Sequence, residues 1–313
     1  MSTILITDCD HPSVETEREI LESAGYAVEV ANCRTESDVV TAGERAVALL
    51  TQYAPITDLV MRTLPMVRVV GRYGVGLDNI DLPAARQRGI RVVNVPDYCV
   101  SEVADHALAL VLTLTRGIAA LDRGIHAGIW DFRLGGELRR SAEMQLGIVG
   151  IGRIGSALAR RALAIGFKTV ATDPVRPQIP GVLLVDLEQL LETSDVVSLH
   201  VPLDATTSHL IDAVALARMK RGAYLVNTSR GGVVDQTALV AALRRGDLAG
   251  AALDVLEREP IESHDALKDL PNVVLTPHAS FYSRESLVEM KRRVATGMVE
   301  ALAMPSGVGV SRS

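Results

Sequence analysis

Short aliphatic runs alternate with segments of helical apolar spacing along nearly the whole chain. The first aliphatic run is Thr3–Thr7. The segment Val14–Ala24, which comes next, has the apolar spacing of a helix, and Gly25 predicts the C-terminal cap of that helix. Continuous aliphatic runs are typical of strands that are buried on both faces of a parallel sheet. The alternation therefore predicts the α/β fold class, with helices on both faces of the sheet. The first predicted strands are Thr3–Thr7, Ala27–Val30, Val67–Val70 and Ile90–Val95.

The alternation is interrupted after Pro96 and then resumes at Met144. Val103–Leu114 has the pattern of a long buried helix, and the more polar Gly117–Arg140 predicts irregular structure that includes Trp130. Ser283–Ala303 again has helical spacing. The second series of predicted strands is Leu146–Val149, Thr169–Thr172, Val196–His200, Ala223–Asn227, Ala249–Leu253 and Val273–Thr276.

Two domains are expected, because a chain of 313 residues is longer than a domain with a single hydrophobic core usually is. The interruption after Pro96 places the first domain at residues 1–97. We expect the last helix to return to it, so that residues 283–313 complete that domain. Residues 98–282 form the second domain, and the tail 305–313 is expected to be loose.

Composition and charge narrow the class of protein. The net charge is −6, and no basic stripe suggests a nucleic-acid partner. The three scattered cysteines form no CxxC pair, and the N-terminus has acid where a signal peptide needs base. The most apolar helical run, Ala107–Thr115, is shorter than a membrane span. These features predict a cytoplasmic protein that binds small molecules and has neither a nucleic-acid nor a membrane partner.

A glycine-rich turn follows the predicted strand at Leu146–Val149. Gly150, Gly152 and Gly155 have the G-x-G-x-x-G spacing, and a helical segment comes next. In a dinucleotide site the first glycine permits the turn, the second admits the pyrophosphate and the third allows close helix packing. The helix N-terminus adds free N–H groups for the phosphates.

Asp173 ends the next predicted strand, about 20 residues after the turn, where an acid meets the adenosine ribose. A carboxylate there accepts hydrogen bonds from ribose hydroxyls and repels a 2′-phosphate. The predicted cofactor is therefore NAD, with NADP less favoured. Arg176 lies close in sequence and leaves a dual preference open.

Three side chains in short loops offer acid–base and anion-binding chemistry. His278 follows the predicted strand Val273–Thr276, and imidazole titrates near pH 6.5, which suits proton transfer to or from an oxygen. Glu259 can orient and support that imidazole, although Glu257 is an alternative acid. Arg230, between flanking polar and glycine residues, can hold a carboxylate through its planar fork.

The segment Gly71–Asn79 reads GRYGVGLDN, and its successive glycines can form an anion-binding nest of backbone N–H groups. The other histidines lack a matching acid and glycine context, and are interpreted as helix, strand-end or surface residues. They are His11, His106, His126, His200, His209 and His264. No group of residues has a metal-ligand spacing.

Seven stretches together resemble the D-isomer-specific 2-hydroxyacid dehydrogenases over nearly the full length, in the same order and spacing. They are GRYGVGLDNID, NVPDYCVSEVADHALAL, GIVGIGRIG, HVPLDATTSHLI, VNTSRGGVVD, DVLEREP and TPHAS. The first two are most similar to the branch shared by phosphoglycerate dehydrogenases and C-terminal-binding-protein-like dehydrogenases.

The resemblance implies an NAD-dependent oxidoreductase that transfers hydride between nicotinamide and a D-2-hydroxy acid/2-oxo acid pair. It implies a Rossmann NAD-binding domain, a smaller flavodoxin-like substrate domain, and a homodimer that packs through residues 101–142. Arg230, Glu259 and His278 correspond to the catalytic set. Cofactor contacts are expected at Gly150, Gly152, Arg153, Ile154, Gly155, Asp173, Thr228 and Asp254. Substrate contacts are expected at Tyr73, Gly74, Val75, Gly76 and Arg230.

Two departures from the family pattern limit the transfer. The chain ends soon after its last predicted helix, so serine control through a regulatory extension is not expected. Ser280 and Tyr282 stand where many members have small, glycine-rich sequence, and Tyr282 could narrow the substrate pocket. Two alternatives stay open: an NAD(H)-sensing dimer that binds protein partners, as C-terminal-binding proteins do, and the same chemistry on formate or phosphite.

Overall fold

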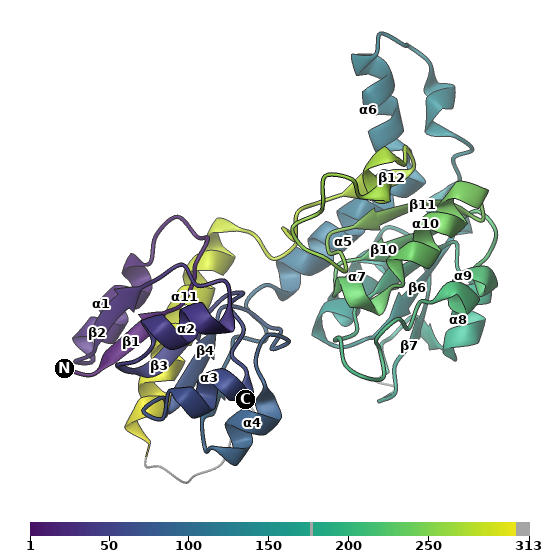
Figure 1. Cartoon of the computed structure of the whole chain (residues 1–313). Coiled ribbons are helices and arrows are strands. Elements are labelled where there is room, and N and C mark those ends of the chain that lie inside the picture. The colour runs from purple at the N-terminus through teal and green to yellow at the C-terminus, as the bar shows by residue number, and fades with distance from the viewer. Residues whose placement is uncertain (176–177, 305–313) are drawn as a thin grey trace. The chain divides into compact units, whose positions relative to one another are not determined.

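The computed structural model describes residues 1–175 and 178–304 and divides the chain into two compact units (Figure 1). Unit 1 contains Met1–Tyr98 and the segment that begins at Ser283, and unit 2 contains Cys99–Tyr282. Each unit has one sheet, and every strand pairing in both sheets is parallel. The predicted α/β fold class is confirmed. Arg176 and the tail 305–313 lie outside the described residues.

Unit 1 has a five-stranded sheet in the order β2-β1-β3-β4-β5, which is the flavodoxin-like arrangement. Its core against one sheet face includes Val39, Val60 and Ala84, one from each of three helices, α2, α3 and α4. On the other face α11 packs against β4 and β5 and beside α1. The elements are β1 (Thr3–Ile6), α1 (Glu15–Ser23), β2 (Ala27–Val30), α2 (Glu36–Ala42), β3 (Ala46–Thr51), α3 (Asp58–Thr63), β4 (Val69–Arg72), α4 (Leu82–Gln87), β5 (Arg91–Val93) and α11 (Arg284–Ala303).

Unit 2 has a seven-stranded sheet in the order β12-β11-β10-β9-β6-β7-β8. This is a doubly wound sheet. The chain adds strands on one side of β6 first, as β7 and β8, and then on the other side, from β9 to β12, so the strand order reverses between β6 and β9. The elements are α5 (Val100–Thr115), α6 (Ile118–His126), η1 (Phe132–Gly135), η2 (Ser141–Glu143), β6 (Gln145–Val149), α7 (Arg153–Ala164), β7 (Lys168–Thr172), β8 (Val182–Leu184), α8 (Leu187–Thr193), β9 (Val196–Leu199), α9 (Ala213–Arg218), β10 (Ala223–Asn227), η3 (Gly231–Val233), α10 (Gln236–Arg245), β11 (Leu248–Leu253), η4 (Ala266–Asp269) and β12 (Val273–Leu275).

Aliphatic side chains fill both faces of the unit 2 sheet. One core cluster joins the sheet to α8, α9 and α10 through Leu190, Leu216 and Leu239. The other joins it to α5 and α7 through Val111 and Leu158. Because ligands of such sheets bind outside the carboxyl ends of the strands, near the reversal point, the β6–β9 boundary marks where a site belongs.

The sequence analysis named no strand at β3 or β8, and it predicted irregular structure where α6 lies. β3, the central strand of unit 1, reads AVALLT, and β8 is a three-residue edge strand. The helix α6 lies inside the segment predicted to be irregular, and of its nine residues only Gly124 is buried. Helices were predicted from the apolar pattern that burial imposes on a sequence. That pattern is weak in α6, because the helix contributes little to the core.

Among the described residues, no single helix has the length and apolar character needed to cross a membrane. The pair α5 and α6 reaches that length only together, and the two helices are bent by 64° relative to each other. The inward face of α5, including Ala104, Ala107 and Val111, is buried in the unit 2 core.

Candidate active site

Three loops that follow strands at one edge of the unit 2 sheet carry side chains able to bind an anion or transfer a proton. Arg230 follows β10, Glu259 follows β11 and His278 follows β12. These strands are consecutive neighbours in a parallel sheet, so their carboxyl ends lie side by side. The fold thus gathers the loops of residues that are distant in sequence at the edge where α/β proteins bind ligands.

His278 and Glu259 form a direct pair. The imidazole Nδ1 lies 2.7 Å from Glu259 Oε2, and Glu259 Oε1 accepts a hydrogen bond of 2.9 Å from the backbone N–H of Leu256. The carboxylate is therefore fixed at both oxygens, and it directs the opposite ring nitrogen, Nε2, away from the pair. The side chains of His278 and Glu259 are 30% and 34% exposed, which leaves them accessible to a ligand.

Two opposing influences set the pKa of Glu259. Partial burial raises the pKa, whereas the hydrogen bond and positive charge of His278, followed by the Leu256 N–H, lower it. The lowering contributions prevail, so the pKa of Glu259 lies below its ordinary value. Glu259 is consequently a carboxylate at neutral pH, which is the form that orients an imidazole and stabilises its protonated state.

Asp254, at the end of β11, organises the His278 loop. Its buried carboxylate accepts hydrogen bonds from the Thr276 hydroxyl (2.6 Å) and from the backbone N–H groups of Ala279 and Ser280. The backbone carbonyl of Asp254 accepts from His278 N–H at 2.7 Å. These bonds hold His278 at a backbone φ of +53°, which few non-glycine residues adopt.

Arg230 emerges from a tight turn at the end of β10. The amide of Asn227 donates to the Arg230 carbonyl (2.9 Å), and the Asn227 side-chain oxygen accepts from Ser229 N–H and Oγ–H. The Arg230 guanidinium is half-buried and donates to the Ser229 carbonyl at 2.7 Å. A buried Asn thus fixes the backbone from which the arginine side chain projects.

The glycine turn lies between β6 and α7, beside the reversal point of the sheet. Gly152 is the N-cap of α7 and no side chain caps the helix, so the N–H groups of Arg153, Ile154 and Gly155 have no intrahelical acceptor. These groups, with the positive end of the helix dipole, make an anion site that suits a pyrophosphate.

The three glycines are required for different reasons. Gly150 has φ +89°, and an added Cβ would lie 2.8 Å from the His200 carbonyl. At Gly155 an added Cβ would lie 2.1 Å from the Gly150 oxygen, so that glycine permits the close approach of helix and turn. At Gly152 an added Cβ would contact nothing within 4 Å. The protein's own packing does not require glycine at Gly152, which fits a space reserved for a ligand.

Asp173 stands at the end of β7 and has two roles available. Its carboxylate accepts hydrogen bonds from Ile151 N–H (2.9 Å) in the glycine turn and from Val175 N–H (2.8 Å) in its own loop. The first bond ties the turn to the neighbouring strand. The remaining lone pairs of the carboxylate can accept hydrogen bonds from a ribose.

Thr228 carries an unsatisfied polar atom at the same edge. Its hydroxyl is buried and has no hydrogen-bond partner among the described residues. Buried polar atoms nearly always have a partner, so an orphaned hydroxyl beside the β10 loop fits a contact with a bound group. With the glycine turn and Asp173, the residues present therefore fit a dinucleotide.

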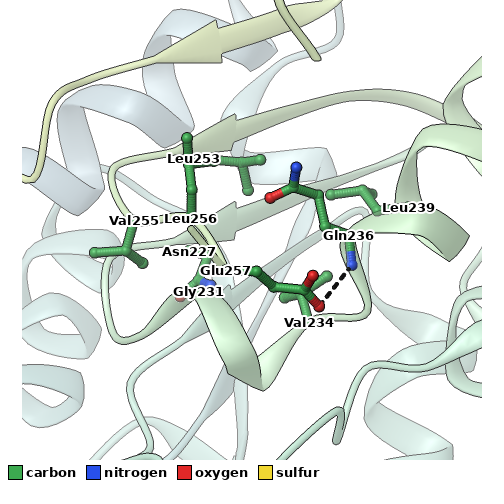
Figure 2. Close-up of a pocket in the computed structure, with 9 residues that line it drawn as sticks. All are labelled: Asn227, Gly231, Val234, Gln236, Leu239, Leu253, Val255, Leu256 and Glu257. Carbon is green, nitrogen blue, oxygen red and sulfur yellow. Dashed lines mark hydrogen bonds between the residues drawn. The ribbon is translucent and has the colours of Figure 1, made fainter. Parts of the chain in front are cut away.

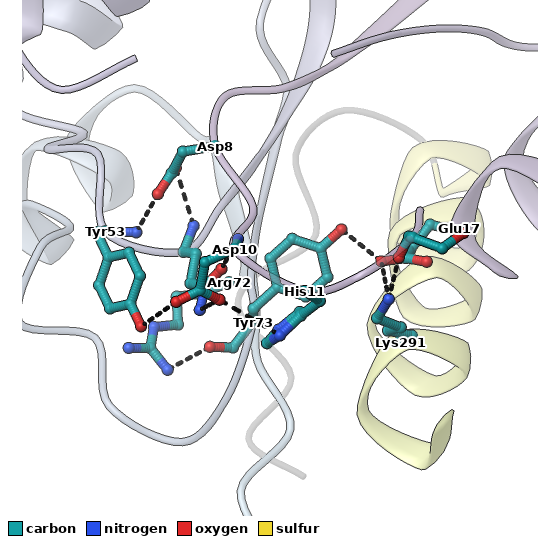
Figure 3. A network of polar contacts seen from close by, with 10 residues as sticks. Asp8, Asp10, His11, Glu17, Tyr53, Arg72, Tyr73 and Lys291 are labelled. Atoms are coloured by element: carbon teal, nitrogen blue, oxygen red, sulfur yellow. Dashed lines mark hydrogen bonds and ion pairs between the residues drawn. The ribbon is translucent and has the colours of Figure 1, made fainter. Parts of the chain in front are cut away.

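The segment Gly71–Asn79 belongs to unit 1, begins in the last two residues of β4 and continues into the loop after it. Tyr73 is buried, and its hydroxyl donates to the buried Glu17 at 2.6 Å, so a substrate could meet only the backbone of Tyr73 (Figure 3). Gly74 has φ +112°. Among the described residues, the backbone N–H groups of Val75 and Gly76 have no acceptor, as an anion nest requires.

A second polar cluster at the ends of β1 and β3 was not singled out from the sequence. Asp10 accepts hydrogen bonds from Gln52 Nε2 (2.5 Å) and the Tyr53 hydroxyl (3.0 Å), as Figure 3 shows for Tyr53. The order of strands in unit 1 reverses between β1 and β3, so this cluster also lies where such sheets bind ligands. The sequence signal was weak because Asp10 and Gln52 are far apart in the chain.

The structure resolves the choice between the two glutamates. Glu259 pairs with His278, whereas Glu257 lies 2.8 Å from His209 Nε2. The sequence interpretation that His209 lacks a matching acid is wrong, because only the fold brings these two loops together. His106 also has an acidic neighbour, with Nε2 at 3.6 Å from Asp254 Oδ1. Within the described residues, no group of three or more His, Cys, Asp or Glu side chains could hold a metal ion.

Comparisons with known proteins identify the family of the chain. A family model described as "D-isomer specific 2-hydroxyacid dehydrogenase, NAD binding domain" matches residues 108–280. A glyoxylate reductase of Korarchaeum cryptofilum is 45% identical over 260 residues, which cover 81% of this chain and 78% of that protein.

Solved structures resemble nearly the full length of the chain. The TT0316 protein of Thermus thermophilus has a TM-score of 0.88 and 37% identity, with 96% of each chain covered. A D-lactate dehydrogenase of Aquifex aeolicus, complexed with NAD and lactic acid, has a TM-score of 0.83 and 30% identity over 96% of this chain and 94% of that one.

The chain belongs to the D-isomer specific 2-hydroxyacid dehydrogenase family. It is an NAD-dependent oxidoreductase of hydroxy acids, as the sequence predicted. NAD as the cofactor is likewise confirmed.

Proposed function

We propose that the chain reduces a small 2-oxo acid to the corresponding D-2-hydroxy acid, with Arg230, Glu259 and His278 as its catalytic residues. The observation that carries this assignment is the His278–Glu259 pair at the carboxyl edge of the unit 2 sheet. Bound NADH supplies the hydride that is added to the oxo carbon. The protein must then supply a proton to the oxo oxygen, which is the task of an imidazolium.

In this proposal His278 Nε2 donates the proton while Nδ1–H remains hydrogen-bonded to Glu259 Oε2. The carboxylate keeps one ring nitrogen protonated and the ring oriented, and its charge stabilises the imidazolium before transfer. After transfer, hydride and proton have converted C=O to CH–OH, and His278 is neutral until solvent reprotonates it. In the reverse direction, neutral His278 accepts the hydroxyl proton.

The substrate carboxylate is assigned to the Arg230 guanidinium of unit 2. Within unit 1, the backbone N–H groups of Val75 and Gly76 are proposed as anion-binding substrate contacts. A guanidinium holds a carboxylate through two parallel hydrogen bonds, and it also polarises the adjacent carbonyl. Gly74 has a positive φ, which glycine adopts more readily than other residues, and it shapes the loop that carries these two amides. Unit 1 is accordingly the substrate domain, and unit 2 the NAD domain.

The cofactor contacts are assigned to the edge residues of unit 2. Gly150, Gly152, Arg153, Ile154 and Gly155 hold the pyrophosphate. Asp173 accepts hydrogen bonds from the adenosine ribose and disfavours the extra phosphate of NADP. Thr228, whose buried hydroxyl has no partner among the described residues, and Asp254 contact the nicotinamide half.

Glyoxylate is the first substrate to test, because a relative with 45% identity is a glyoxylate reductase. Tyr282 follows the His278 loop and is exposed, whereas Ser280 is buried with its N–H bonded to Asp254. Of these two departures from the family pattern, Tyr282 is therefore the side chain proposed to limit substrate size.

We further infer a cytoplasmic homodimer without nucleic-acid or membrane partners. Apolar side chains of α6 and η1 and the turn between them are exposed, and a monomer rarely exposes an apolar patch of this kind. They are Ile118, Ile125, Ile129, Trp130, Phe132 and Leu134. All three cysteines lie in the described part of the chain and none forms a disulfide, which suits a reducing compartment.

The test is oxidation of NADH and of NADPH at 340 nm by the purified protein, with glyoxylate, hydroxypyruvate, pyruvate, a branched 2-oxo acid and 2-oxoglutarate. Turnover with NADH that is lost in His278→Ala supports the proposal. Binding of NADH without turnover of any 2-oxo acid contradicts it, and would favour a nucleotide-sensing dimer. Activity with formate or phosphite alone would assign the same site to a different substrate class.

A further inference from the structure

Two histidines share an uncommon backbone conformation and a common partner loop. Among the described non-glycine residues, only His209 (φ +49°) and His278 (φ +53°) have positive φ. His278 pairs with Glu259, and His209 pairs with Glu257, two residues earlier on the loop that follows β11. The first pair belongs to the proposed active site, and the second has no role in that proposal.

The Glu257 carboxylate joins two segments of unit 2. Its Oε1 lies 2.8 Å from His209 Nε2, on the loop after β9, and accepts the backbone N–H of Gln236 at 3.2 Å. Figure 2 shows the second contact in a small pocket lined by Gly231, Gln236, Leu256 and Glu257. One carboxylate therefore connects the loops after β9 and β11 to the start of α10.

The backbone contacts around the pair bring these loops into direct apposition. His209 N–H donates to the Gly232 carbonyl at 2.8 Å, in the turn that follows Arg230. At Gly231 an added Cβ would lie 1.8 Å from the Leu256 carbonyl carbon, so the Arg230 turn packs directly on the Glu259 loop. The His209–Glu257 pair thus lies where the loops that carry Arg230 and Glu259 meet.

The His209–Glu257 pair contributes too little to the stability of the fold for stability to explain its presence. His209 and Glu257 have side chains that are 51% and 34% exposed, and ion pairs of such exposure contribute little to folding. The positive φ of His209 is itself unfavourable, although histidine tolerates it better than most residues. Strain that stability does not account for is typically retained at functional sites.

We propose that the His209–Glu257 pair is a positioning element that fixes the distance between the loops carrying Arg230 and Glu259. Rigid placement of reacting groups governs the rate of the chemical step, and a misplacement of about 1 Å can cost about 100-fold. His209 and Glu257 act through Arg230, Glu259 and His278, so this inference rests on the proposed function. Neither residue needs to touch the substrate or the cofactor.

Two substitutions at one position separate the contact from the backbone conformation. His209→Gln keeps an N–H donor at nearly the position of Nε2 and so keeps the bond to Glu257. His209→Asn favours positive φ but is too short to reach the carboxylate. The matched control is Arg245→Gln, which removes the exposed Arg245–Asp247 pair (2.7 Å) of the same unit.

The first readout is steady-state kinetics. We expect His209→Asn to lower kcat about 10-fold with NADH affinity and Tm unchanged, and His209→Gln and Arg245→Gln to keep more than half of the activity. Glu257→Gln should add little to His209→Asn, since both remove the same interaction. A His209→Asn protein with the kcat of the unmodified chain, or one that loses Tm and activity in parallel, overturns the proposal.

The second readout is independent of turnover. Amide hydrogen exchange should accelerate at least tenfold in residues 228–236 and 254–260 of His209→Asn, and in neither segment of His209→Gln. Unchanged exchange in both segments overturns the positioning role. If the unmodified chain turned over no 2-oxo acid, the proposed function would fall, while the exchange data would still decide whether the pair holds the loops together.

Discussion

The two sheets carry ionisable clusters that differ in one property, which is exposure to solvent. In unit 1, Glu17, Tyr73 and Lys291 are respectively 0%, 2% and 7% exposed (Figure 3). In unit 2, His278 and Glu259 keep about a third of their side-chain surface. Both clusters are hydrogen-bonded, so bonding does not distinguish them. Exposure decides which cluster can exchange protons with a ligand, and which one can only hold the fold.

The unit 1 cluster has the properties of a structural anchor. Glu17 on α1 accepts from the Tyr73 hydroxyl and lies 3.9 Å from Lys291 on α11, whose ammonium also donates to the Ser13 carbonyl. Burial, and then the charge of Glu17, raise the pKa of Tyr73 well above its ordinary value, so the phenol remains a donor. These bonds fasten the C-terminal helix to α1 and to the loop after β4.

The largest expected effect is the loss of activity in His278→Ala, which should leave the stability of the fold almost unchanged. Removing the proton donor should lower kcat by about 10²- to 10⁴-fold, because general acid–base catalysis contributes that much. The partly exposed side chain contributes little packing, so Tm should stay within about 2 °C. Steady-state assay of 2-oxo acid reduction and a thermal melt of the same preparation measure both quantities. Retention of more than a tenth of kcat would remove His278 from the role of proton donor.

The second prediction concerns Lys291→Met, which removes one partner of the buried pair. An uncompensated buried carboxylate typically costs about 3–5 kcal/mol, so the free energy of unfolding should fall by about that amount. Adding Glu17→Gln should recover part of the loss, since the buried charge is then gone. Urea denaturation measures both variants.

A matched exposed pair provides the control for Lys291. Arg18 and Glu22 on α1 are 3.2 Å apart with side chains 32% and 48% exposed, and Arg18→Met should cost less than about 1 kcal/mol. Equal losses from Lys291→Met and Arg18→Met would show that burial does not set the strength of the unit 1 cluster.

The sequence predicted the sheets better than it predicted the clusters. Aliphatic runs identified most strands, because burial on both faces leaves a local pattern. The loops of Arg230 and His278 could be placed after strands for the same reason. The inward turn of Tyr73 and the pairing of His209 with Glu257 depend on contacts between distant segments, which periodicity does not encode. β3 was missed although AVALLT is apolar, since it lies between short, weakly patterned helices.

The third prediction uses His200, a partly buried histidine beside the glycine turn. Burial lowers the pKa of His200 to about 4, from an ordinary value of 6.5. Between these values the unfolded chain binds a proton that the folded chain excludes, so stability should fall as the pH drops from about 6.5 to about 4. The loss from this group should reach about 1–3 kcal/mol at the acid end.

His200→Gln removes the titration and keeps a polar partner for Ser198, whose hydroxyl lies 2.8 Å from His200 Nε2. The free energy of unfolding of this variant should therefore depend less on pH between 4 and 6.5 than that of the unmodified chain. Parallel pH profiles would mean that His200 takes up its proton equally well in the folded and the unfolded chain. His200 would then titrate as an accessible side chain does, and burial would not separate the ionisable groups that exchange protons from those that do not.

The smallest expected effect is on stability, at Glu259. Its folded pKa lies below the ordinary 4.5, so the ionised form stabilises the fold above that pH, and the contribution disappears as the pH falls through the folded value. Because the pair is about a third exposed, Glu259→Gln should cost less than about 1 kcal/mol at pH 7 and nothing at the acid end. Activity should nevertheless fall at least 10-fold at pH 7, because the amide cannot stabilise the imidazolium. Urea denaturation at pH 7 and pH 3, with kinetics on the same samples, measures this separation; a loss of several kcal/mol at pH 7 would make Glu259 as structural as Glu17.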